Sequence, residues 1–375
     1  MLRKPYLADL TAALLVLPWL AIAEAAPPAG KPVFIQVQGL VPFSIGLNGF
    51  IVAGDFVGGI EGGGFYWMPS SGVTLIGGSH GYISRDGRTI VGSLKDANGI
   101  EQPATWAGGT SWRLLGPLVP NAVHCQGVLG YANATSGDGR YVVGGGYVGT
   151  RPPEDCSLAT AFRWDESGGY VLLPNLTGKD SRADAISADG RVIVGYQAGT
   201  RVEGVKWVDA QVEVIQGPIG PVGYARAVNR DGTLIAGTAC AGSKTAWTWS
   251  PAGGVKCYQV DPPRWVPWLD PINNDYSLYI YGVSDDGRVM GGDIQFDVAR
   301  NGEEESVVWF DGEPVFLRDY LRSHGYPDAF EGHFNTGRIT AVSPDGRVIV
   351  GRNGGLLGSV NLNGFVVILP ELDKK

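Results

Sequence analysis

Helical periodicity is almost missing from this sequence. Apart from a weak match in "VFLRDYLRSHG" at 315–325, no segment of ten or more residues repeats its apolar positions at the helical spacing. Short β-branched runs between Gly-rich turns take its place, and glycine accounts for 58 of 375 residues. The fold class predicted from this pattern is all-β.

Excess positive charge is missing too. Lys and Arg number 29 against 37 Asp and Glu, which gives a net charge of -8. A nucleic-acid binder needs a concentrated basic face, so we expect no nucleic-acid partner.

Signatures of metal and cofactor chemistry are equally scarce. No His and Cys residues have zinc-site spacing, and no Gly-x-Ser-x-Gly stands at a strand-to-helix turn. The glycine run "GDGRYVVGGG" lacks the helix that a phosphate loop requires, and "DANGIE" at 96–101 has only part of a calcium loop. We expect no cofactor and no metal.

The N-terminal 25 residues have the pattern of an export signal. Positive "MLRKPY" precedes the apolar "LTAALLVLPWLAIA", and Ala23-Glu24-Ala25 offers a cleavage site. The apolar run is shorter than the roughly 20 residues of a membrane span, although an uncleaved anchor is the alternative. We expect a signal peptide at 1–25, a linker at 26–32, no membrane span in the mature chain, and a secreted or periplasmic location.

One hairpin motif recurs at a period of roughly 50 residues, which indicates a repeat architecture. "ISADGRVIVGYQ" at 186–197 has close relatives such as "ISRDGRTIVGS" and "VSPDGRVIVGR". Gly accepts positive φ and Asp or Asn tolerates it, so each pair predicts a turn between strands. The seven pairs are Asn48-Gly49, Asp86-Gly87, Asp138-Gly139, Asp189-Gly190, Asp231-Gly232, Asp286-Gly287 and Asp345-Gly346.

Each repeat predicts four strands, which we name A to D. Strand A precedes the turn, strand B follows it, strand C ends near a Trp, and strand D closes the unit. The strand C residues are Trp67, Trp106, Trp164, Trp207, Trp249 and Trp309, with Val367 in the last repeat. Four antiparallel strands per repeat are typical of a propeller blade.

The two ends of the repeat region are complementary. The seventh repeat stops after its strand C, "GFVVILPEL", while "KPVFIQVQGL" at 31–40 reads like a strand D without its own repeat. We therefore predict one seven-bladed β-propeller over residues 33–372, in which strand 33–40 completes the last blade and 373–375 form a tail. An open β-solenoid is the alternative, and we expect a monomer.

The motif "SxDGRxIVG…W…G…L" resembles the HAF-type extracellular repeat family, over about residues 33–370. The resemblance implies an exported bacterial protein, and it implies no catalytic residue.

Length varies mainly between strand D and the next strand A, and less between B and C. In an up-and-down blade both connections emerge on one face, where binding residues usually lie. The cysteines fit this face: we predict disulfides between Cys125 and Cys156 and between Cys240 and Cys257.

Candidate site residues come from these connections. Aromatic side chains in 258–282 and the residue types of 318–338 suit saccharide stacking and acid–base chemistry, although a small core under a long loop or ordinary loop polarity explains them equally. The ligand-binding candidates are Trp265, Trp268, Tyr279, Arg322 and His80, and the catalytic candidates are His324, His333, Tyr326 and Arg338.

The sequence thus predicts an exported propeller that binds a glycan, an envelope component or a protein through the face of long connections. The alternative is a polysaccharide lyase or glycoside hydrolase that uses the same face.

Overall fold

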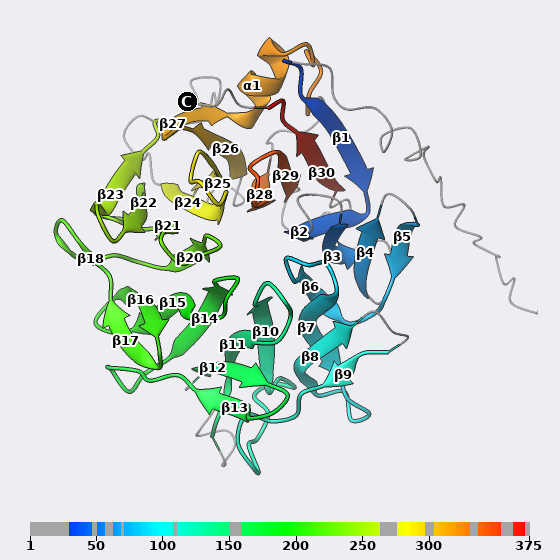
Figure 1. The fold of residues 1–375 in the computed structure, drawn as a ribbon, viewed down its shortest axis with the longest axis vertical. Coiled ribbons are helices and arrows are strands. Elements are labelled where there is room, and N and C mark those ends of the chain that lie inside the picture. The colour runs from blue at the N-terminus through cyan, green and yellow to red at the C-terminus, as the bar shows by residue number, and fades with distance from the viewer. Residues whose placement is uncertain are drawn as a thin grey trace, which may run out of the picture.

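Seven four-stranded antiparallel sheets surround a central axis in the computed structural model of the chain (Figure 1). This arrangement confirms the seven-bladed β-propeller. The structure describes residues 30–46, 51–56, 63–68, 71–107, 111–149, 159–262, 276–296, 304–330, 337–353 and 363–371.

The first six blades each take four consecutive strands as A, B, C and D. Blade 1 contains β2 (Leu40–Gly46), β3 (Ile51–Phe56), β4 (Gly63–Met68) and β5 (Gly72–Leu75). Blade 2 contains β6 (Ser79–Ile83), β7 (Thr89–Lys95), β8 (Glu101–Ala107) and β9 (Arg113–Leu114). Blade 3 contains β10 (Gly130–Thr135), β11 (Val142–Tyr147), β12 (Ala159–Asp165) and β13 (Gly169–Leu172). Blade 4 contains β14 (Ser181–Ile186), β15 (Val192–Ala198), β16 (Val202–Val208) and β17 (Gln211–Val214). Blade 5 contains β20 (Ala225–Val228), β21 (Ile235–Thr238), β22 (Thr245–Ser250) and β23 (Gly254–Gln259). Blade 6 contains β24 (Tyr276–Val283), β25 (Val289–Phe296), β26 (Glu304–Phe310) and β27 (Glu313–Phe316). A small hairpin of β18 (Gln216–Gly217) and β19 (Gly220–Pro221) links blades 4 and 5.

Blade 7 joins the two ends of the repeat region. It takes β28 (Arg338–Val342), β29 (Val348–Arg352) and β30 (Asn363–Ile368) as strands A to C and β1 (Val33–Gln38) as strand D. Six residue pairs align β1 with β30, so the predicted closure is confirmed. The closing strand ends at Gln38 rather than at residue 40, because Gly39 turns the chain with φ +69° and Leu40 already begins β2.

A short helix follows the last strand of blade 6. The weak helical pattern near residue 317 corresponds to α1 (Leu317–Ser323), which buries Leu317 and Leu321. Strand D of blade 6 therefore ends at Phe316, where the helix begins. Figure 1 places α1 beside the start of β1 at the outer rim of the ring.

The repeated turns depend on two side chains and one glycine. In blade 4 the Ser187 hydroxyl donates to Asp189 Oδ1 at 2.6 Å and accepts from the Val192 amide, while the Arg191 amide donates to Asp189. Gly190 alone adopts the left-handed region, at φ +76°. The expected tolerance of Asp for positive φ is therefore not used, because Asp189 acts through its carboxylate as a local acceptor.

A second set of glycines, mostly near the middle of strand B, lets strand A approach closely. A Cβ added to any of them would lie only 1.8–2.3 Å from the carbonyl oxygen of a residue in strand A or, in blade 5, just before it. The set is Gly54, Gly92, Gly144, Gly195, Gly237, Gly292 and Gly351. At the same level every strand A departs from regular pairing through a β-bulge or similar irregularity, so the glycines make room for the bulged backbone.

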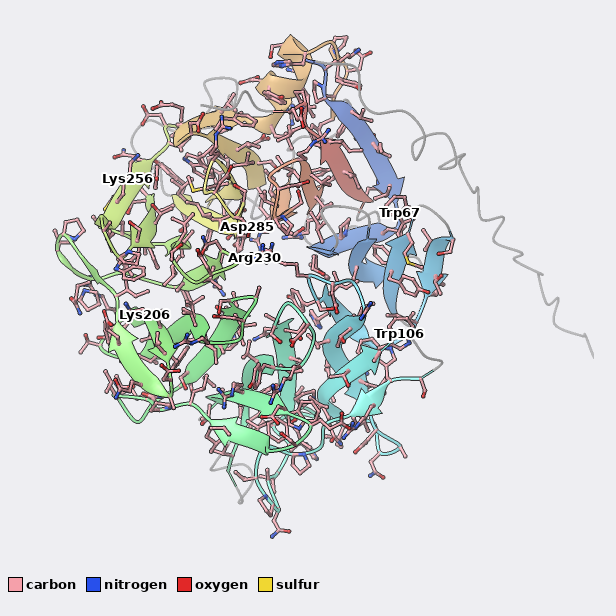
Figure 2. The ribbon with its side chains drawn as sticks, viewed as in Figure 1. Trp67, Trp106, Lys206, Arg230, Lys256 and Asp285 are labelled. Atoms are coloured by element: carbon pink, nitrogen blue, oxygen red, sulfur yellow. A yellow bond between two sulfur atoms is a disulfide. The ribbon has the colours of Figure 1, made fainter. Side chains whose placement is uncertain are left out.

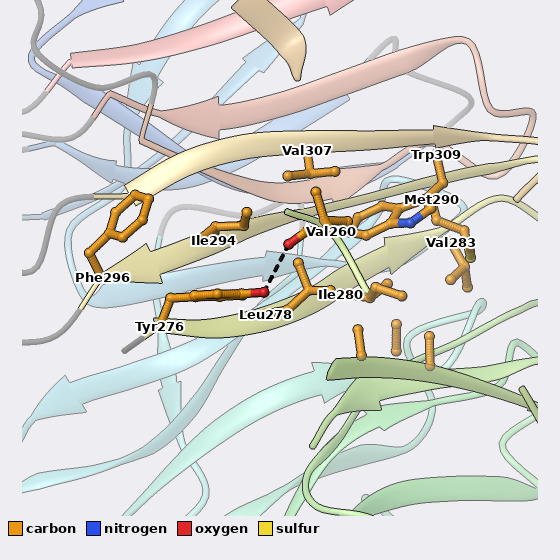
Figure 3. Packing of buried hydrophobic residues seen from close by; sticks show 13 residues of the cluster. Val260, Tyr276, Leu278, Ile280, Val283, Met290, Ile294, Phe296, Val307 and Trp309 are labelled. Carbon is orange, nitrogen blue, oxygen red and sulfur yellow. Dashed lines mark hydrogen bonds between the residues drawn. The ribbon is translucent and has the colours of Figure 1, made fainter. Parts of the chain in front are cut away.

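Apolar side chains fill every contact between neighbouring blades. Seven buried clusters occupy the seven interfaces, including the one between blades 7 and 1. Figure 3 shows the cluster between blades 5 and 6, where Trp309 is fully buried and the Tyr276 hydroxyl donates to the Val260 carbonyl at 3.1 Å. In the next blade pair the same register position carries Val367, as the sequence predicted.

No helix in the described part of the chain is long and apolar enough to pass through a bilayer.

We predict that Gly195→Ala lowers the free energy of unfolding by about 1–3 kcal/mol or more, because the new methyl group overlaps the Arg182 carbonyl oxygen, 1.9 Å away. Chemical denaturation measures the change. Gly63→Ala is the matched control, since its nearest neighbour would lie 3.5 Å away. Equal stability of the two variants would contradict the close-approach explanation.

We also predict that deletion of residues 33–38 destabilises the whole ring, because blade 7 then exposes the edge of β30 and loses six pairs of residues. Thermal unfolding followed by near-ultraviolet circular dichroism reports the loss of tertiary packing. A truncated chain that melts cooperatively at the wild-type temperature would count against closure by β1.

Candidate functional site

A cavity of about 580 Å³, which we call the axial cup, lies where the seven A strands meet. Its size falls within the range of small-molecule sites. The lining residues are Phe43, His80, Tyr82, Glu101, Tyr131, Asn133, Arg182, Asp184, Arg226, Tyr281, Arg338, Thr340 and Arg352. The lining includes early residues of A strands and residues next to B-to-C connections, so the cup opens on the face of the long connections.

The bulges of strand A aim side chains into this cup. In six of the seven blades the residue skipped by regular pairing lines the cavity: Phe43, Asn133, Asp184, Arg226, Tyr281 and Thr340. Blade 2 skips both His80 and Gly81, and there His80 and Tyr82 take this place. A bulge commonly re-aims a side chain next to a functional site.

One ionic cluster joins blades 4 and 5. Asp184 accepts hydrogen bonds from Arg182 Nε at 2.6 Å and from Arg226 Nη1 at 2.8 Å. Each guanidinium also lies over a tyrosine ring, Arg182 over Tyr196 and Arg226 over Tyr224. Burial lowers the pKa of Arg182, but Asp184 outweighs this effect and leaves the pKa above its ordinary value, so Arg182 stays charged.

A second ionic cluster joins blades 6 and 7. Glu304 accepts hydrogen bonds from Arg338 Nη2 at 2.8 Å and from Arg352 Nη2 at 2.7 Å. Arg338 Nε lies 3.5 Å from Asp293, and its guanidinium lies 4.7 Å from the centre of the Tyr281 ring. In both clusters, then, two arginines share one carboxylate.

Asp293 is the most perturbed acid of the site. It is fully buried, and its Oδ1 has no hydrogen-bond partner among the described residues. Burial raises the pKa of Asp293 to about 7, although Arg338 acts in the opposite direction.

Aromatic rings form the opposite wall. Phe43 stacks on His80 with ring centroids 6.2 Å apart, and the edge of Tyr131 faces His80 at 6.1 Å. His80 Nδ1 lies 3.3 Å from Ser79 Oγ, which donates to Glu101 at 3.2 Å. This wall offers ring faces beside hydroxyl and carboxylate groups.

The opposite end of the axis is narrowed by the turns. Residues after the turn Ser positions are joined in sequence by hydrogen bonds, such as Gly137 N to Ala188 O at 2.9 Å and Asp285 N to Pro344 O at 2.8 Å. Across the ring Arg85 Nη1 donates to Asp285 Oδ2 at 2.6 Å. Figure 2 labels Asp285 and Arg230 together at the centre, where the Arg230 amide also donates to Asp285.

A belt of mostly aliphatic side chains lies just inside the turn end. Its members are Ile45, Ile83, Thr135, Ile186, Val228, Val283 and Val342, and they line a cavity of about 160 Å³. The belt separates the polar turns from the polar wall of the cup.

Three of the predicted site residues meet at the cup. His80 and Arg338 line it, and Tyr279 stacks on the cup residue Tyr281 at 5.5 Å. All three belong to A strands rather than to the loops in which the sequence placed Tyr279 and Arg338.

Three other candidates gather at the outer rim instead. The Tyr326 hydroxyl donates to the Pro32 carbonyl at 2.9 Å and its ring packs on Phe34, which fixes the closing strand. His324 Nδ1 lies 2.7 Å from the Tyr320 carbonyl at the end of α1, and Arg322 is exposed in the last turn of the helix. The structure does not bring these three residues to the cup.

The remaining candidates Trp265, Trp268 and His333 lie outside the described residues. Cys156 also lies outside them, so its pairing with Cys125 stays a prediction. The predicted disulfide between Cys240 and Cys257 is present, with Cα atoms 5.7 Å apart, and it ties the B-to-C connection of blade 5 to strand D. Among the described residues no group of three or more His, Cys, Asp or Glu side chains is placed to hold a metal ion.

The sequence-based prediction missed most of the cup, although a signal for it exists. The residue three before the turn Ser, or before Asn229, which replaces that Ser in blade 5, varies from blade to blade, whereas its neighbours repeat. Asp184, Arg226 and Tyr281 occupy this position. When one position of a repeated motif varies while its neighbours stay the same, its side chain is not needed to build the blade and is a candidate for a functional site.

We predict that Asp293 makes stability fall with rising pH. Because its pKa in the folded protein, about 7, lies above its ordinary value of 3.8, the folded state keeps a proton that the unfolded state releases. This stabilising contribution is complete below about pH 4 and is lost as the pH rises through about 7.

Denaturation of Asp293→Asn at several pH values tests this. The stability of the variant relative to the wild type should rise from pH 4 to pH 8, which spans the two values. Asp209→Asn, at a side chain that is 71% exposed, should follow the wild-type profile. Parallel profiles for Asp293→Asn and the wild type would contradict the raised pKa.

Comparisons with known proteins bear on the fold. No protein-family model matches the chain, and no curated protein matches it. Among solved structures, a prolyl endopeptidase aligns at a TM-score of 0.55 and 10% identity, over 90% of this chain and 51% of that one. The β-propeller domain of Cps50 (Swd1) from Myceliophteria thermophila aligns at 0.51 and 11%, over 89% and 98%. TolB from Acinetobacter baumannii aligns at 0.43 and 14%, over 58% and 53%.

The chain therefore spans about half the length of the endopeptidase and of TolB. At these identities the endopeptidase and Cps50 alignments establish the fold alone: the chain is similar to β-propellers and has their architecture.

Proposed function

We propose that this protein is an exported binding propeller that holds a saccharide in the axial cup. The observation that carries the proposal is the composition of the cup wall, where a group of aromatic rings faces a group of hydrogen-bonding side chains across a cavity of about 580 Å³. Saccharides present apolar ring faces that stack on aromatic side chains and hydroxyl edges that need polar partners.

The construction of the cup supports binding of a small ligand or the end of a chain. Its side chains come from seven blades held by buried interfaces, so the site is assembled in advance. The turn end, where Arg85 and Asp285 are bonded across the axis, is narrower than the cup, so the wider approach is from the face of the long connections. A concave cavity of this size suits a glycan terminus better than the wide surface that a standard protein complex buries.

Export is part of the proposal. The Cys240–Cys257 disulfide fits an oxidising compartment, where such bonds persist. The signal pattern at residues 1–25 and the HAF-type repeat motif, both from the sequence, support the same location. Trp265 and Trp268, from the sequence alone, extend the proposed contact to the long connection before blade 6.

We predict that Phe43→Ala weakens saccharide binding roughly two- to tenfold, because it removes one stacking face of the cup. A glycan array identifies a ligand, and isothermal titration calorimetry measures its affinity. Phe310→Ala is the matched control, since this half-buried ring packs on Tyr320 at the rim, outside the cup.

Equal affinity of Phe43→Ala and the wild type for every bound glycan would contradict binding in the cup. The enzymatic alternative predicts a different signal, the ultraviolet absorbance of an unsaturated sugar released from an acidic polysaccharide. If that absorbance appears with the wild type and is lost in the His80→Ala variant, the protein is a lyase and the binding proposal is overturned.

A further inference from the structure

We propose that the saccharide held in the cup carries an oxyanion, a carboxylate or a phosphate, which the paired arginines of the wall bind. This inference rests on the proposed saccharide function and specifies its ligand. Three features of the cup support it: the charge of its wall, the unused donors of its arginines, and the fixed planes of its guanidinium groups.

The charge of the wall is the first feature. Four arginines line the cup, against the two acids Glu101 and Asp184. Glu304, behind the wall, is the third carboxylate and is shared by two of the arginines. Among the described residues, four guanidinium groups face the carboxylates of Glu101, Asp184 and Glu304. The fourth acid, Asp293, lies 3.5 Å from Arg338, and burial raises its pKa, which lowers its share of negative charge at neutral pH.

Unused hydrogen-bond donors are the second feature. A guanidinium has five N–H donors, yet among the described residues Arg182 uses only Nε, on Asp184, and Arg352 uses only Nη2, on Glu304. Their side chains are 37% and 27% exposed, so the remaining N–H groups are accessible from the cup. Oxygen atoms of an oxyanion accept such paired donors in a bidentate arrangement.

Fixed guanidinium planes are the third feature. Arg226 lies 4.3 Å from the centre of the Tyr224 ring, and Arg338 lies 4.7 Å from that of Tyr281, which is itself stacked on Tyr279. Each guanidinium is thus held between a ring and a carboxylate. A planar fork that is already oriented loses little entropy when it binds a planar carboxylate.

The ring faces of the cup remain necessary in this arrangement. Phe43 and Tyr82, whose ring centroids are 6.0 Å apart, stand beside the arginine wall in the same cavity. A bare inorganic anion would use the arginines and leave these rings uncovered. A sugar with an acidic substituent uses both.

The test is calorimetry with two matched pairs of probes: trigalacturonic acid against its methyl ester, and glucose 6-phosphate against glucose. We expect at least one acidic member to bind about tenfold more tightly than its neutral partner at low salt, as a charge-assisted hydrogen bond predicts. Arg182→Gln should remove most of this preference. Arg113→Gln, at a 57% exposed arginine paired with Glu166 on the outer strand, should retain it.

The outcomes separate the two proposals. Equal binding of acidic and neutral members overturns the oxyanion inference and leaves saccharide binding in place. No binding of any saccharide, on a broad glycan array as well, overturns both. A preference for the uronate or for the phosphate, lost in Arg182→Gln, supports the inference and names the anion; Arg352→Gln replaces that variant if it does not fold to the wild-type circular dichroism spectrum.

Discussion

The close approach of strand A to a glycine in strand B is the constraint on which the rest of this structure depends. In every blade a carbonyl oxygen of strand A occupies the space that a side chain on that glycine would need, as with Arg182 and Gly195. The room admits the irregularity in strand A, and in six blades a single skipped residue turns its side chain toward the axis. The glycine that ends each β-branched run of the repeat therefore makes room for the bulge that directs side chains into the cup.

Within one short motif, some residues build the fold and others line the cavities along the axis. Ser187, Asp189 and Gly190 build the turn, and the β-branched residues after them pack between blades. The residue just before the turn Ser supplies the aliphatic belt, and the residue three before it supplies the ring of the cup. Because the motif recurs in every blade, the belt and the ring of the cup form separate layers along the axis, and Arg85 and Asp285 bridge the axis at the turn end. Chemistry in the cup can then change without any change in the scaffold.

The sequence predicted almost the whole fold but only part of the candidate site. Turn pairs, Trp spacing and complementary ends are local or periodic features, so they identified seven blades and the closing strand. The site prediction relied instead on residue type within long connections. It found His80, Tyr279 and Arg338, yet it also selected Tyr326, which the structure uses to fix the closing strand through Pro32. It passed over Asp184, Arg226 and Glu304, because ordinary charges in a strand or at its start give no sign that they face one another.

The periodic motif and the residues of its turns are enough to predict the seven-bladed architecture from the sequence alone. The polar residue, the Asp and the Gly that build a turn stand close together in the sequence, as do Ser187, Asp189 and Gly190, and the strands of a blade follow one another in order. The evidence for the architecture therefore lies within one repeat. The wall of the cup is decided only when the ring closes. Asp184 and Arg226 belong to different blades, and Glu304 and Arg352 to two others, and each pair meets because the strands converge on one axis. Such contacts arise from the curvature of the whole ring, which no single repeat contains.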